Sequence, residues 1–269
     1  MRKIVIILLV SFASQAFGSK ISDAYEALSV FDYFKAKQLF YKSLPKYPCE
    51  ASYGLANIYF RTDNPFSNID SAAKYIAIGQ SRFKDTATYS LYHISKETIN
   101  SLAISVGNKG YEKYSSHNSV ESYNYFLSHF YFSDSTLLAQ TYFKRDGMQL
   151  SKALASQSSE QVTQFLLQYP QSSLYIKAKK LYYDYQYNEQ APDKTIHQYQ
   201  LFIKQYPNNP NVTIAESNLF NLIQPLHSSD SIYNFIKKYS TSLTEEAAWK
   251  LLYSTSVKSY SKEELTNFL

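Results

Sequence analysis

The second half of the chain repeats one pattern of apolar and polar positions. Four segments align on a phenylalanine: YNYFLSHF at 123–130, VTQFLLQYP at 162–170, YQLFIKQYP at 199–207 and IYNFIKKYS at 232–240. In each, an apolar or aromatic residue lies three positions before the phenylalanine, and Leu or Ile follows it directly. Phe or Tyr stands four positions after it. Offsets of three and four place these side chains on one helix face, so each segment is predicted to be an amphipathic helix.

The predicted packing positions on these helices are the aligned phenylalanines: Phe126, Phe165, Phe202 and Phe235. Pro170 and Pro207 follow two of the segments, where proline ends a helix. A small residue then stands at the same distance after each phenylalanine: Ala139, Ala178, Ala215 and Ala248. A small side chain at a fixed place in a second helix lets two antiparallel helices approach closely. We therefore expect helix–turn–helix repeats.

The phenylalanines stand 39, 37 and 33 residues apart, a period typical of stacked helical hairpins. The composition agrees, because the chain has only 6 glycines beside 27 tyrosines and 17 phenylalanines. Sandwiches and barrels need many turn glycines. The predicted fold class is therefore all-α, an α-solenoid of stacked repeats.

The first half carries a second form of the unit. FKAKQLFYKSLPKYP places Ala36, Phe40, Ser43 and Pro48 at spacings of four, three and five, and YGLANIYF follows as a second helix. Between 97 and 120 the pattern fades, and GNKGYEKYSSHNS suggests an irregular connection. The predicted organisation is N-terminal repeats at 19–96, an irregular connection at 97–120, and a repeat array at 121–260. SKEELTNFL, at 261–269, is expected to begin a further helix, with Ser261 and Glu264 spaced as a capping box.

These spacings resemble those of tetratricopeptide (TPR) repeats. The second-half phrase, in which F-Φ-x-x-Y-P precedes an alanine, resembles the repeats of periplasmic TPR-like proteins of the BamD and CpoB type. The resemblance covers about 120–255 in that form and 21–95 in the ordinary TPR form. The chain has no lipobox cysteine of the BamD kind and no N-terminal coiled coil of the CpoB kind. The resemblance implies an adaptor that holds other envelope proteins without catalysis.

The N-terminus has the layout of a secretory signal peptide. Arg2 and Lys3 precede an apolar run from 4 to 10, and Ala16 and Gly18 are placed for cleavage before Ser19. The run is too short to span a bilayer as a helix. We therefore predict a signal peptide at 1–18 and a periplasmic or extracellular mature chain, with no transmembrane segment. An uncleaved N-terminal anchor is the alternative.

Charge and cysteine content restrict the function further. The formal net charge of the chain is +5, and it falls when the basic residues of the signal segment are removed. So mild a charge argues against nucleic acid as a partner. Cys49 is the single cysteine, so no intramolecular disulfide can form and the fold must rely on its core.

The sequence shows no constellation typical of an enzyme or a metal site. Its five histidines, His93, His117, His129, His197 and His227, include no pair at helical ligand spacing. Cys49 follows Pro48 without an adjacent base, which favours a structural thiol. Gly107 to Gly110 (GNKG) lacks the frame of a phosphate-binding loop and suggests a flexible turn. Asp63 and Asp70 flank a loop without the spacing of a calcium site. We expect no catalysis, no metal and no cofactor.

The segment LYIKAKKLYYDYQY, at 174–187, is the predicted partner-binding surface. In a helix, Leu174, Ala178, Leu181, Tyr182 and Tyr185 share one face, which should be core. The residues on the other faces are Tyr175, Lys179, Tyr183 and Tyr187. Exposed tyrosines are common at binding hot spots. The alternative, favoured for Tyr183, is that these tyrosines pack against the next repeat. Asn211-Val212-Thr213 also matches an N-glycosylation acceptor.

These features predict a non-catalytic scaffold or adaptor in envelope assembly or secretion. Its partners would be other envelope proteins, bound as a peptide or helix in a concave groove. One alternative is an N-terminal docking module of a larger envelope protein, whose enzymatic or polymer-binding domain lies beyond Leu269. Another is a glycan-binding protein. That function predicts exposed aromatic rings along one groove, whereas an adaptor predicts a mixed groove with lysines and asparagines.

Overall fold

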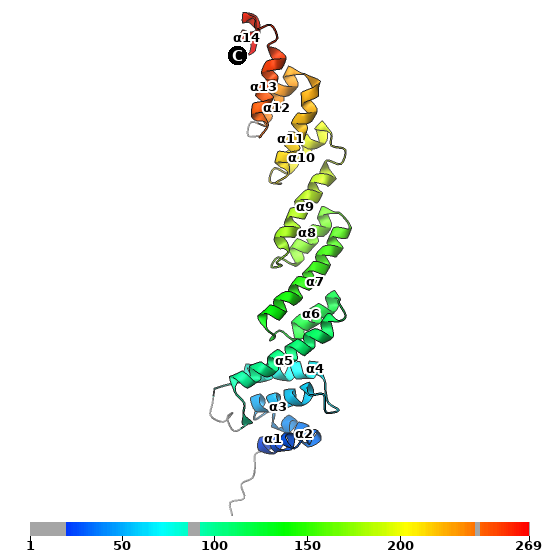
Figure 1. The fold of residues 1–269 in the computed structure, drawn as a ribbon, viewed down its shortest axis with the longest axis vertical. Coiled ribbons are helices and arrows are strands. Elements are labelled where there is room, and N and C mark those ends of the chain that lie inside the picture. The colour runs from blue at the N-terminus through cyan, green and yellow to red at the C-terminus, as the bar shows by residue number, and fades with distance from the viewer. Residues whose placement is uncertain (1–19, 86–91, 240–242, 269) are drawn as a thin grey trace, which may run out of the picture. The chain divides into compact units, whose positions relative to one another are not determined.

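The computed structural model describes residues 20–85, 92–239 and 243–268. The predicted signal peptide at 1–18 therefore lies outside the described residues. The described part contains 14 α-helices, short 3₁₀ segments and no strand, so the all-α prediction is confirmed (Figure 1). The chain divides into two compact units between Tyr142 and Phe143. This boundary lies within α7 (Ser135–Ala155), and each unit is described by itself below.

The first unit is built of helices that pack against their neighbours in sequence. They are α1 (Lys20–Ser29), α2 (Tyr33–Ser43), α3 (Pro48–Phe60), α4 (Ile69–Arg82), α5 (Lys96–Ser115) and α6 (Val120–His129). One core runs through all six and contains Phe40, Leu55, Ile76, Val106 and Phe126. Side-chain caps begin several of the helices, as where Asn68 accepts the N–H of Ser71 at 2.8 Å.

The structure corrects the predicted irregular connection at 97–120. Most of this segment is α5, which begins after the N-cap Ser95 and runs to Ser115. The GNKG stretch lies inside this helix, and Gly107 and Gly110 are buried. A Cβ on Gly110 would collide with the ring of Phe130, and one on Gly107 with the side chain of Ser133. These glycines therefore allow a close approach between a helix and its neighbour, and they do not form a turn. The predicted boundary between the two halves is also displaced, to the middle of α7.

The second unit begins with the C-terminal half of α7 and continues in pairs of helices. They are α8 (Ser159–Gln168) with α9 (Tyr175–Gln190), α10 (Ile196–Gln205) with α11 (Val212–Ile223), and α12 (Ser229–Lys238) with α13 (Glu245–Ser256). The 3₁₀ helix η2 (Gln224–Leu226) follows α11, and α14 (Lys262–Phe268) ends the described chain. Contacts between α9 and α10, and between α11 and α12, join successive pairs. The ribbon shows these pairs following one another (Figure 1).

The four aligned helices, α6, α8, α10 and α12, have the same local geometry at both ends. Each is preceded by a residue with positive φ and then by a Ser or Thr N-cap: Asn118–Ser119, Gln157–Ser158, Lys194–Thr195 and His227–Ser228. Each ends where the N–H of the following aromatic residue donates to the carbonyl of the aligned phenylalanine, at 2.8–2.9 Å. Each phenylalanine ring also packs on that aromatic ring, with centroids 5.1–5.6 Å apart. The sequence repeat therefore corresponds to a repeated local structure.

All four phenylalanines are buried, with at most 3% of their surface exposed. Ala178, Ala215 and Ala248 are also fully buried in the second helices of their pairs. Ala139 departs from the expectation, because it is exposed on α7. The preceding helix, α6, packs against α5 of the first unit. A small residue is therefore not needed at this place in α7.

The predicted terminal helix is present as α14. Ser261 caps it by accepting the N–H of Glu264 at 3.2 Å, while the Glu264 carboxylate accepts the N–H groups of Lys258 and Ser259 at 3.1 and 2.8 Å. Phe268 packs edge to face against Tyr253 of α13, with ring centroids 5.2 Å apart. The apolar end of this helix therefore adds to the core of the last helix pair.

We expect Leu219→Ala to lower the free energy of unfolding by about 2–5 kcal/mol, because the fully buried Leu219 leaves a cavity between α10 and α11. Leu167→Ala is the matched control, because Leu167 is 71% exposed on α8 and its change should stay within about 0.5 kcal/mol. Urea denaturation followed by circular dichroism measures both values. Equal losses in the two variants would contradict the described core.

We expect Gly110→Ala to destabilise the chain by about 1–3 kcal/mol, because the added methyl group overlaps the buried ring of Phe130. Gly147→Ala is the control within another helix, where a Cβ would meet only the Leu174 side chain at an ordinary 3.9 Å. That variant should be neutral or gain up to about 1 kcal/mol from helix propensity. If Gly110→Ala were equally well tolerated, the close approach of α5 and Phe130 would be wrong.

Candidate functional site

The predicted binding surface lies on α9, and part of it forms a groove with the start of α11. The groove encloses about 270 Å³ and is lined by Ile176, Lys179 and Tyr183 of α9 and by Pro210 and Asn211 of the loop before α11, with Lys180 and Asp184 beside them. Ile176 is 77% exposed, Lys179 is exposed and Tyr183 is half-buried. The groove therefore offers apolar contact area with a cationic rim.

Two asparagines of the loop hold the wall of this groove in place. The Asn209 side-chain amide donates to the Tyr183 carbonyl oxygen at 3.2 Å and to Gln186 Oε1 at 3.0 Å. Asn211 Nδ2 donates to the same carbonyl oxygen at 3.2 Å and to Asp184 Oδ1 at 3.0 Å. Asn209 is buried, and its own Oδ1 accepts the N–H of Asn211 at 2.8 Å. The loop is thus clamped to α9 by hydrogen bonds that an apolar groove alone would not supply.

Sequence reasoning did not identify this clamp. In the sequence, Asn211 stood out only as the start of an N-glycosylation acceptor. Nothing in its spacing showed that both amides would reach the carbonyl oxygen of one residue a helix away. In the structure, the Asn211 amide nitrogen is occupied by the two hydrogen bonds to α9.

Tyr187 does not join the groove and packs between repeats instead. Its ring lies edge to face against Phe202, with centroids 5.1 Å apart, and parallel to Tyr199 at 6.3 Å. Its hydroxyl accepts a hydrogen bond from Asn218 Nδ2 at 3.0 Å. Burial raises the pKa of the adjacent Tyr199 to about 12, and the nearby Tyr187 hydroxyl adds to the shift. Tyr199 therefore remains a neutral phenol at physiological pH, and both tyrosines act as packing residues.

The structure thus brings together two of the four predicted surface residues. Lys179 and Tyr183 line the groove, Tyr187 belongs to the packing of α9 on α10, and Tyr175 is half-buried at the first turn of α9 outside the groove. The alternative, packing against the next repeat, describes Tyr187, while Tyr183 is half-buried beside the loop of that repeat, whose asparagines bond to its carbonyl oxygen. Ile176, which the helical pattern did not single out, is the most exposed apolar side chain in the groove.

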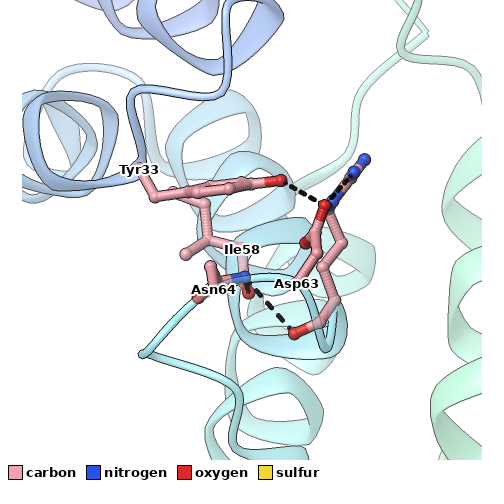
Figure 2. Close-up of polar contacts among 5 residues, drawn as sticks. Tyr33, Ile58, Asp63 and Asn64 are labelled. Atoms are coloured by element: carbon pink, nitrogen blue, oxygen red, sulfur yellow. Dashed lines mark hydrogen bonds and ion pairs between the residues drawn. The ribbon is translucent and has the colours of Figure 1, made fainter.

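The acidic residues that flank the loop of the first unit are engaged in structural contacts. Asp63 accepts a hydrogen bond from the Tyr33 hydroxyl at 2.8 Å, and the Arg61 guanidinium donates to both its carboxylate oxygens, at 3.0 and 2.5 Å (Figure 2). Asn64 Nδ2 donates to the Ile58 carbonyl oxygen at 2.9 Å and ties the loop to α3. Asp70 accepts from Lys113 and from the Tyr114 hydroxyl, each at 2.7 Å.

These contacts change the ionisation of Asp63 in a defined direction. The hydrogen bonds from Arg61, followed by the one from Tyr33, hold the pKa of Asp63 well below its usual range. The same pairing raises the pKa of Arg61. Asp63 is therefore ionised at every ordinary pH and would not serve as a general acid.

Across the described residues, no group of three or more His, Cys, Asp or Glu side chains is arranged to hold a metal ion. The Cys49 thiol is buried and donates a weak hydrogen bond to the Gly79 carbonyl oxygen, with the atoms 3.5 Å apart. His129 stacks on Tyr125 of its own helix, with ring centroids 3.9 Å apart. Within the searched part of the chain, no helix combines the length and apolar character needed to cross a membrane.

Comparisons with known proteins add no family to this description. The chain matched no protein-family model, no curated protein and no solved structure.

We expect Asp63→Asn to lower the melting temperature at neutral pH, because the variant loses the carboxylate that pairs with Arg61. The folded-state pKa of Asp63 lies below its unfolded value of about 3.9, so its contribution is complete above that value and is lost as pH falls through the folded pKa. The difference between wild type and variant should therefore shrink progressively below about pH 4. Asp85→Asn, at an exposed position, controls for the change in net charge. A difference that stays constant down to pH 2 would contradict this pairing.

Proposed function

We propose that this chain is a non-catalytic, TPR-like scaffold that binds other proteins of the cell envelope. An amphipathic helix pair cannot bury its apolar face alone, so such pairs stack and leave an extended surface for partners. The four repeated helices with buried phenylalanines, and the contacts that join successive pairs in the second unit, support this reading. The proposed site of action, the periplasm or the cell exterior, rests on the signal-peptide pattern at 1–18.

The observation that carries the proposal is the groove between α9 and the start of α11. It combines a strongly exposed apolar residue, Ile176, with a half-buried tyrosine and a lysine. Tyrosine with an adjacent apolar contact supplies binding area at small entropic cost. The Asn209 and Asn211 hydrogen bonds hold the groove wall before a partner arrives, and preorganisation of this kind reduces the cost of binding. A peptide or a helix of a partner protein fits this mixed surface.

The mixture of groups favours a protein ligand over a sugar. Sugar binding of the kind considered above requires aromatic rings exposed along one groove, but the Tyr183 ring is half-buried and Tyr187 is packed between helices. The wall contains lysine and asparagine instead. An adaptor of this kind needs no cofactor, metal or nucleic acid.

We expect Ile176→Asp to reduce capture of envelope proteins by the chain at least tenfold, because the charge would have to be buried beneath the partner. The matched control is Leu167→Asp, which places the same charge at a 71% exposed position of α8 outside the groove. The measurement is crosslinking and quantitative mass spectrometry on the source cell envelope, with both variants at equal concentration. Partners retained by Leu167→Asp and lost by Ile176→Asp would support the proposal.

Two results would overturn it. Equal recovery with the two variants would remove the α9 groove as the binding surface. Recovery of no protein above the level of an unrelated chain would remove the scaffold function itself. Circular dichroism of both variants confirms that the helices are intact.

A further inference from the structure

A second groove lies in the second unit, where residues of α10, the end of α11, η2 and α12 line one pocket. It encloses about 670 Å³, within the range of pockets that bind ligands. Ile196 from the start of α10, Ile223 from the end of α11 and Leu226 of η2 provide apolar walls, and Leu226 is 55% exposed. Gln200, Ser231 and Asn234 add polar groups. The groove can therefore receive a large apolar side chain with hydrogen-bonding groups around it.

The same positions of the repeat line a smaller depression at α8, two repeats before α12. Between α7 and α8, a space of about 160 Å³ is lined by Gln161, Gln164, Phe165, Gln168 and Tyr169 of the α8 segment. Counted from the aligned phenylalanine, these positions correspond to Ser231, Asn234, Phe235, Lys238 and Tyr239 in the α12 groove. Equivalent positions of α8 and α12, the first helices of their pairs, thus line a depression in both repeats. The two depressions differ in charge.

The charge of the α12 groove is one-sided. Lys237 and Lys238 line it at the end of α12, and no carboxylate is present among the described lining residues. The earlier depression has Lys152 and four glutamines, again with no carboxylate among the residues that line it. Lys237 and Lys238 are both exposed, so their charges are available to attract carboxylates from solution. The ligand should therefore be acidic.

The aromatic residues of the groove argue against an acidic polysaccharide as that ligand. Phe235 and Tyr239 are only 2% and 6% exposed, so their ring faces are covered by neighbouring side chains and not available for stacking on a sugar. The exposed apolar group is Leu226, an aliphatic residue, which suits an aliphatic or aromatic side chain of a peptide.

From this geometry we infer that the groove between α10, η2 and α12 binds an acidic peptide segment, which inserts one large apolar side chain between Ile223 and Leu226 and places its carboxylates at Lys237 and Lys238. The inference rests on the proposed scaffold function and specifies the chemistry of one class of partner. It assigns the cationic contacts to α12, whereas the α9 groove carries Lys179 and Lys180 beside the carboxylate of Asp184, with Ile176 as its exposed apolar residue.

The test is selection of a random dodecapeptide display library on the chain without residues 1–18. We expect the enriched peptides to carry clusters of Asp and Glu beside Leu, Ile or Phe. Their affinity should fall about tenfold or more in the double variant Lys237→Glu, Lys238→Glu, and should weaken with added salt. The matched control is Lys258→Glu, Lys262→Glu, which makes the same change in net charge at exposed positions outside the groove and should keep the affinity of wild type.

A second variant keeps the test independent of helix stability. Acidic residues at the end of α12 oppose its dipole, so Leu226→Asp, placed in η2, should abolish binding of the same peptides without touching that helix end. Circular dichroism establishes that each variant is folded.

The outcomes separate this inference from the proposed function. Enriched peptides that are neutral or basic, or that bind both lysine double variants equally, would overturn the inference. Peptides lost only in Ile176→Asp would also overturn it while leaving the scaffold function in place. Binding of alginate, an acidic polysaccharide, in place of acidic peptides would replace the inferred ligand class. A library that yields no chain-specific peptide would count against both.

Discussion

The contact on which the repeated part of the molecule depends is the burial of one phenylalanine against the aromatic residue one turn later. Phe126, Phe165, Phe202 and Phe235 each make this contact with the residue that caps their helix, and each is buried. Because the aromatic residue also donates its backbone N–H to the phenylalanine carbonyl, the same pair ends the helix. A helix of fixed length with a fixed buried face can pair repeatedly with a second helix, and the grooves lie between such pairs.

The two grooves of the second unit follow from this regularity in different ways. The α9 groove is held by a loop whose asparagines bond to the helix backbone, so its shape is set by polar contacts. The α12 groove uses exposed positions of a first helix, which the buried phenylalanine leaves free to vary. Packing positions are constrained by close contact, whereas outward positions are not. This difference lets one architecture carry an amide-rich depression at α8 and a cationic groove at α12.

Sequence reasoning succeeded where one periodicity decided the structure. The helical spacing around each aligned phenylalanine predicted α6, α8, α10 and α12, and the Ser261–Glu264 spacing predicted α14. It failed at two glycines, because glycine can either allow a turn or make room for a close neighbour within a helix. Gly107 and Gly110 suggested a turn, but in α5 they make room for Ser133 and Phe130, residues that only the tertiary fold brings close. The prediction that Ala139 is a packing position was also wrong, because tertiary packing places α6 against α5.

The sequence by itself determined the helical class, the repeated phenylalanine register and the proline-marked ends of helices, because these depend on neighbours within one or two turns. Only the tertiary structure decided that Tyr187 packs between repeats while Tyr183 lines a groove, because both are tyrosines on the same helix and differ only in what lies opposite. It also decided that Asn209 and Asn211 clamp α9, and that Lys237 and Lys238 share a groove with α10 and η2. These contacts depend on how one helix pair packs against the next, and the spacing of residues within a helix does not determine that packing.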